Sequence, residues 1–101
     1  MFIIKRNNLS NFNTNKVIIM IGMFSGCSSL KEINLSNFNT KNVKHMSRMF
    51  YGCSLLKEIT LSNFNTYNVK DMRGMFYGCP DETKMKMKEQ IKNIKEHAFQ
   101  D

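Results

Sequence analysis

The stretch Leu35-Ser36-Asn37-Phe38-Asn39-Thr40 decides the fold, because the same six residues stand at positions 9–14 and again at 61–66. Consecutive copies begin 26 residues apart, and many other positions keep this phase. They are Val17, Val43 and Val69; Met20, Met46 and Met72; Met23, Met49 and Met75; Phe24, Phe50 and Phe76; and Cys27, Cys53 and Cys79. A repeat of this length is typical of successive supersecondary units that stack on one another.

Each 26-residue unit contains two hydrophobic patterns. Residues 33–35 read I-x-L, an alternation typical of a short strand with one buried face. From Val43 to Cys53 the apolar residues are spaced by three, three, one and three positions, which places them on one stripe of a helix. We therefore predict a strand, an Asn-rich turn and a short helix in each unit. Thr40 or Asn42 would cap the helix, and Gly52 would end it.

The full repeat can be read over residues 35–59, as L-S-N-F-N-T-K-N-V-K-H-M-S-R-M-F-Y-G-C-S-L-L-K-E-I. This pattern resembles the BspA-like leucine-rich repeat family, and the resemblance covers about residues 4 to 79. It implies an α/β solenoid: a right-handed coil with short parallel strands on one face and short helices on the other. It also implies a cell-surface or secreted protein that binds other proteins or surfaces, whereas Met1 to Arg6 lacks the apolar core of a secretory signal.

The two ends of the chain differ from the central units. We assign residues 1–87 to the repeats, as a partial unit, two full units and a final partial one whose strand is Lys84-Met85-Lys86-Met87. Residues 88–101 are predicted to form a C-terminal capping helix, because apolar residues follow helical spacing and an open end would expose the core. The alternative is a basic amphipathic helix on a membrane surface, but its lysines are mixed with glutamates, which favours the cap.

Binding is expected on the strands, through the side chains that point away from the core. These candidate residues are Arg6, Asn8, Glu32, Asn34, Glu58, Thr60, Lys84 and Lys86. The predicted face is polar and has no aromatic anchor of the kind that dominates tight interfaces. Contacts there are therefore expected to be weak, or to depend on many repeats acting together.

A second candidate site lies in the first unit, where Ile18, Ile19 and Ile21 occupy positions that are polar in both of the following units. One interpretation is a locally overpacked or strand-like segment, because β-branched residues weaken a helix. The other is a docking patch for a partner, for a second copy of the chain or for further repeats upstream. The second interpretation makes self-association through this apolar segment a prediction.

Catalytic chemistry is not indicated by any motif. The sequence shows no nucleophile arrangement, no glycine-rich phosphate loop and no metal-ligand spacing, so we predict a non-catalytic protein without cofactor or metal. The three cysteines share one phase and are expected to be buried free thiols, because stacked helices would hold them too far apart for a disulfide. Met46, Met49, Met72 and Met75 are expected in the core.

The charge balance suggests a second class of function. Fifteen Lys and Arg against eight Asp and Glu give a net charge of +7, and a basic group with nearby tyrosines would suit a nucleic acid or an anionic surface. The basic group is Lys44, Arg48, Lys70 and Arg73, and the tyrosines are Tyr51, Tyr67 and Tyr77. No nucleic-acid motif is present and no apolar run approaches the roughly 18 residues of a membrane span. We therefore predict a protein or cell-surface partner, with nucleic acid less favoured.

Overall fold

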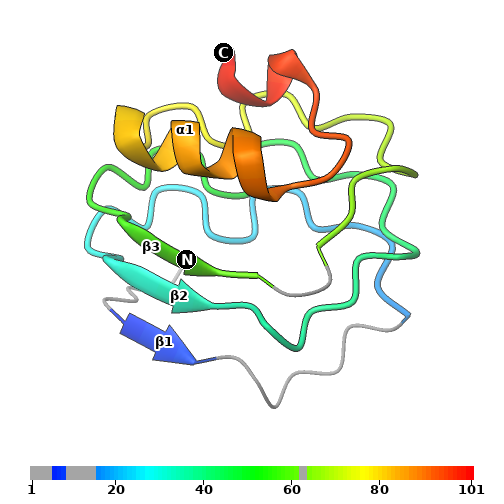
Figure 1. Ribbon diagram of the computed structural model, residues 1–101, viewed down its shortest axis with the longest axis horizontal. Helices are drawn as coiled ribbons and strands as arrows, with labels where there is room; N and C mark the ends of the chain where they lie inside the picture. The colour runs from blue at the N-terminus through cyan, green and yellow to red at the C-terminus, as the bar shows by residue number, and fades with distance from the viewer. Residues whose placement is uncertain (1–5, 9–15, 62–63) are drawn as a thin grey trace.

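Short parallel strands align the units with one another. The computed structural model describes residues 6–8, 16–61 and 64–101, and within them β1 (Arg6–Asn8), β2 (Glu32–Asn34) and β3 (Glu58–Thr60) form one sheet in the order β1-β2-β3 (Figure 1). Ile33 pairs with Asn7 on one side and with Ile59 on the other, so the partners are 26 residues apart. The prediction of short parallel strands is confirmed. The copy of the six-residue stretch at 9–14 lies outside the described residues.

The predicted helices in the second half of each unit are wrong. Within this half of the second unit, His45 forms parallel backbone bridges with Ile19 and Asp71, and residues 47–52 form turns. Only some amides bond locally, as when the Met49 N–H donates to the Met46 carbonyl at 3.3 Å. The intervening amides donate to the next unit: the Phe50 N–H reaches the Met75 carbonyl at 2.8 Å. An α-helix would use all these amides within its own segment. The spacing of apolar residues that predicted one stripe of a helix is therefore the spacing of successive turns.

Glycines allow the units to approach closely at the end of these turns. Gly52 and Gly78 have φ values of +75° and +86°, in the left-handed region that side chains disfavour. A Cβ atom added at Gly78 would lie 3.1 Å from the Cα atom of Gly52. The positive φ expected of Gly52 is present, but it belongs to a turn rather than to the end of a helix.

The core consists of the columns that the repeat predicted. Phe24, Phe50 and Phe76 are each 1% exposed, and their rings stack in sequence with centroids 5.5 and 5.4 Å apart. The four methionines predicted to be in the core are buried as well. Corresponding residues of successive units therefore pack directly on one another.

The C-terminal helix lies earlier in the sequence than predicted. The helix α1 spans Asp81–Gln90, so the strand predicted at residues 84–87 is wrong. Pro80 precedes the helix, and the two acidic residues of its first turn favour a helix start. Thr83 and Met87, one turn apart, are buried, and the Thr83 hydroxyl donates to the Leu56 carbonyl at 2.6 Å. Met85 points outward and is 67% exposed, which a strand alternation could not predict.

Residues after α1 continue the stack instead of extending the helix. Lys92 forms a parallel bridge with Asn65, and the Phe76 N–H donates to the Ala98 carbonyl at 2.8 Å. The 3-10 helix η1 (Glu96–Phe99) follows, and the ring of Phe99 stacks on Phe76 at 5.8 Å. The helix predicted from residue 88 is therefore wrong in position. Figure 1 shows α1 and η1 beyond β3, at the end of the molecule away from β1. The division of the chain at residues 87 and 88 stays a prediction.

Candidate functional site

The strand face is the first candidate site, and β2 and β3 carry most of its described side chains. Glu32 lies opposite Glu58, and Asn34 lies opposite Thr60. Ile33 and Ile59 between them are buried, so the flanking side chains point away from the core. Thr60 and Glu58 are exposed, whereas Glu32 and Asn34 are partly buried.

The remaining residues predicted for the strand face come from two other elements. Arg6 and Asn8 lie in β1, in register with Glu32 and Asn34, and their side chains lie outside the described part of the structure. Lys84 and Lys86 belong to α1 instead of a fourth strand, so their predicted place on the sheet is wrong.

Lys86 nevertheless reaches the strand face from the helix. Its ammonium nitrogen lies 3.7 Å from a carboxylate oxygen of Glu58 and 3.8 Å from one of Glu82. Lys84 points elsewhere: its Nζ atom lies 3.7 Å from Asp81 and 5.9 Å from the ring centroid of Tyr77. The structure thus brings Lys86 to the predicted face and separates Lys84 from it.

The isoleucine patch, which consists of Ile18, Ile19 and Ile21, is exposed to solvent. The exposed fractions are 51%, 60% and 54%, although Val17 beside them packs against the core. The segment is held by its backbone: the Ile18 carbonyl accepts from the Lys44 N–H at 2.8 Å, and Ile19 forms a parallel bridge with His45. The patch is therefore a surface on an ordered segment, and its role in docking stays a prediction.

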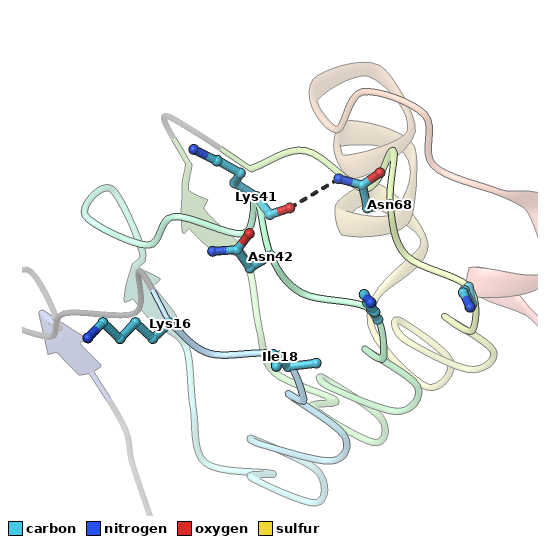
Figure 2. A pocket seen from close by; sticks show the side chains of 7 residues that line it. Lys16, Ile18, Lys41, Asn42 and Asn68 are labelled. Atoms are coloured by element: carbon cyan, nitrogen blue, oxygen red, sulfur yellow. Dashed lines mark hydrogen bonds between the residues drawn. The ribbon is translucent and has the colours of Figure 1, made fainter.

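A hollow beside the isoleucine patch gathers positive charge. It has a volume of about 480 Å³ and is lined by Ile18, two asparagines and four lysines (Figure 2). The lysines, which we call the lysine cluster, are Lys16, Lys41, Lys44 and Lys70. Sequence reasoning named Lys44 and Lys70 and missed the other two.

The path of the chain explains the two missed lysines. Lys16 and Lys41 lie in the turn that precedes the predicted helix, so they are not part of the predicted basic group on the helical face. In the structure the Lys70 N–H donates to the Lys44 carbonyl at 2.8 Å, and the Asn68 amide donates to the Lys41 carbonyl at 3.1 Å. These bonds between units place lysines from different parts of the repeat around one hollow (Figure 2).

Buried threonines join successive units, a role that the sequence analysis also missed. The Thr40 hydroxyl donates to the Asn65 carbonyl and accepts from the Asn65 N–H, both at 2.9 Å. The Thr66 hydroxyl donates to the Lys92 carbonyl at 2.7 Å. Thr40 therefore does not cap a helix. The recurrence of threonine at positions 14, 40 and 66 was the signal that could have revealed this ladder.

The model of the family described as Mycoplasma protein of unknown function, DUF285, matches residues 2–99. The chain belongs to this family. No curated protein and no solved structure matches it.

A cluster of metal ligands and a membrane-spanning helix are both absent from the described residues. In residues 6–8, 16–61 and 64–101, no group of three or more His, Cys, Asp or Glu side chains converges as a metal site would require. Within the same residues, no helix has the length and apolar character needed to span a membrane.

The cysteines of the DUF285 chain form a buried column of free thiols. Cys27, Cys53 and Cys79 are all buried and unbridged, as predicted, although no helices keep them apart. The thiols instead donate to carbonyls of the preceding unit: Cys53 Sγ lies 3.1 Å from the Phe24 oxygen, and Cys79 Sγ lies 3.3 Å from that of Phe50. Burial raises the pKa of Cys53 and of Cys79 to about 12, which keeps both protonated and poorly nucleophilic at neutral pH.

These thiols predict a loss of stability in alkaline solution. A thiol in the unfolded chain ionises near its usual pKa of 9.0, whereas folded Cys53 and Cys79 keep their protons up to about 12. Their contribution is complete below pH 9.0 and is lost as the pH rises towards 12, by up to about 1.4 kcal/mol per pH unit and thiol. Urea unfolding at several pH values measures this loss. Cys53→Ala with Cys79→Ala should show a shallower pH dependence, and an equal slope would contradict the assignment.

Proposed function

We propose that this chain is a non-catalytic interaction module, a segment of a right-handed BspA-like leucine-rich solenoid whose strand face binds a protein or a cell-surface component. The observation that supports this proposal is the parallel register of β1, β2 and β3 at the 26-residue period. It aligns outward-pointing side chains in rows on a surface that each further unit would lengthen.

The chemistry of the strand face suggests the kind of contact it makes. Glu32 and Glu58 form an acidic row, and Lys86 brings positive charge to its edge at 3.7 Å from Glu58. Such a mixed-charge surface contributes more to specificity and to the association rate than to affinity. The partner that fits it is a protein or surface component with complementary charges, held weakly by one module and more tightly by an array.

Site-specific photo-crosslinking tests the strand face. A photoreactive residue at Thr60 should capture a discrete component from a surface extract of the cells that make the protein, whereas the same residue at exposed Met85 should not. Glu32→Lys with Glu58→Lys should lower the yield from Thr60 about tenfold, because like charges would replace complementary ones. Equal capture from both positions, or a yield unchanged by the charge reversal, would refute binding at this face.

A further inference from the structure

Two unusual surfaces of this molecule adjoin each other outside the strand face. The isoleucine patch leaves three large aliphatic side chains more than half exposed. The lysine cluster surrounds the neighbouring hollow, and Ile18 belongs to both (Figure 2). A ligand that satisfies the whole surface must therefore accept aliphatic groups and positive charges side by side.

The positive charges of the lysine cluster are not neutralised within the described part of the molecule. Residues 6–8, 16–61 and 64–101 contain no ion pair that involves Lys16, Lys41, Lys44 or Lys70, and no Asp or Glu among them lines the hollow. Asp71 follows Lys70 in the chain, and its backbone forms a parallel β-bridge with His45. The carboxylate of Asp71 accepts a hydrogen bond from the Arg73 backbone N–H at 3.0 Å. The exposed lysines therefore remain available to an anionic ligand.

We propose that the isoleucine patch and the lysine cluster together bind the surface of an anionic lipid bilayer. The isoleucines enter the boundary between headgroups and acyl chains, and the lysines contact lipid phosphates. Peripheral membrane attachment of this kind combines a small buried apolar area with electrostatic attraction to anionic lipids. It uses residues outside the strand face and is independent of the function proposed above.

A nucleic acid fits this surface less well. Binding of single strands relies on aromatic side chains on which bases stack, and the hollow has none among its lining residues. Tyr67 is 74% exposed and lines a smaller hollow of about 260 Å³ that shares Lys41 and Asn68 with the first, but this single ring provides no row of stacking positions. Exposed isoleucines have no comparable interaction with bases.

A second copy of the chain is also disfavoured by charge. Two patches facing each other would bring two lysine clusters together, in a chain whose net charge is +7. Such like-charge juxtaposition opposes association. An anionic bilayer reverses the sign of this interaction while still covering the isoleucines.

Vesicle sedimentation with the full chain tests the proposal. We expect the chain to bind phosphatidylcholine vesicles that contain phosphatidylglycerol, and we expect this binding to decrease as the salt concentration rises. Vesicles of phosphatidylcholine alone should not be bound. Ile18→Ser with Ile19→Ser and Ile21→Ser should weaken binding about 100-fold. Lys44→Gln with Lys70→Gln should weaken it about 30-fold.

Matched variants elsewhere on the surface serve as controls. Leu55→Ser with Met85→Ser removes other exposed apolar groups, and Lys31→Gln with Lys57→Gln removes two exposed lysines near the strands. Both controls should keep vesicle binding within about twofold, since they lie outside the proposed surface. Circular dichroism of each variant confirms that it is folded.

Several outcomes would overturn the proposal. They are the absence of binding to anionic vesicles, equal weakening by the control variants, and binding that ignores the isoleucine substitutions. Binding to a short single-stranded DNA that equals vesicle binding would identify a general polyanion site instead. A doubled mass in size-exclusion chromatography that the isoleucine substitutions abolish would identify self-association.

Discussion

Replacing Phe50 with alanine is expected to lower the free energy of unfolding by about 3–5 kcal/mol, the range for removal of a fully buried aromatic ring. Phe50 is the middle ring of the stacked column and contacts both Phe24 and Phe76. The substitution leaves a cavity between two units, so each neighbouring ring also loses a stacking partner. Urea unfolding followed by circular dichroism measures the effect.

A matched control separates burial from the loss of an aromatic ring as such. Tyr67 is 74% exposed, and Tyr67→Ala should change stability by less than about 0.5 kcal/mol. Phe50→Leu should retain much of the packing and lose less stability than Phe50→Ala. If Phe50→Ala and Tyr67→Ala proved equally stable, the stacked column would not be the centre of the core.

Gly78→Ala is expected to cost about 2–4 kcal/mol, from two causes that act together. A side chain at a φ of +86° is strained in any surroundings. The added Cβ atom would also lie 3.1 Å from Gly52 Cα and 3.2 Å from Gly52 N, and backbone yields less readily than a side chain. The thermal midpoint and the urea midpoint should both decrease.

Gly52→Ala provides the comparison for this prediction. Its φ of +75° carries a similar strain, but its added Cβ would be 3.8 Å from Gly26 Cα, an ordinary contact. This variant should lose only about 1–2 kcal/mol. The difference between the two variants isolates the close approach of neighbouring units, and equal losses would show that strain alone accounts for both.

The parallel strands could be predicted from the sequence because two independent patterns agree there. The I-x-L alternation gives the strand, and the exact recurrence of Leu35-Ser36-Asn37-Phe38-Asn39-Thr40 gives the register with the next unit. Stacking then follows from the need to bury both faces of each unit. The core columns of Phe, Met and Cys follow from the same recurrence, so their burial could be predicted without coordinates.

The second half of each unit could not be predicted correctly, because spacing does not identify the partners of backbone amides. Apolar residues at Val43, Met46 and Met49 occur equally in a helix and in a series of three-residue turns. The helix and the series of turns differ in their backbone hydrogen bonds: in this structure the Phe50 N–H donates to a carbonyl 25 residues away. The recurring glycines at 26, 52 and 78 were the local signal, since positive φ inside every unit interrupts a helix.

The strand predicted at residues 84–87 is wrong because the alternation of Lys and Met there matches the strand period by coincidence. The helix α1 begins after Pro80, and the acidic residues Asp81 and Glu82 in its first turn stabilise it. This helix start determines the structure of the segment in spite of the short alternation. The predicted basic group lacks two lysines of the lysine cluster for a related reason. Lys16 and Lys41 join Lys44 through the path of the turns, and that path differs from the predicted helix.

Pairing between residues 22 to 26 positions apart also constrains how the molecule forms during translation. A unit that leaves the ribosome has amides whose acceptors have not yet emerged, so it gains these bonds only when the next unit follows. Thr66 and Phe76 receive their partners when Lys92 and Ala98 appear. The nascent chain therefore acquires these bonds layer by layer, about one unit behind the part that has left the ribosome.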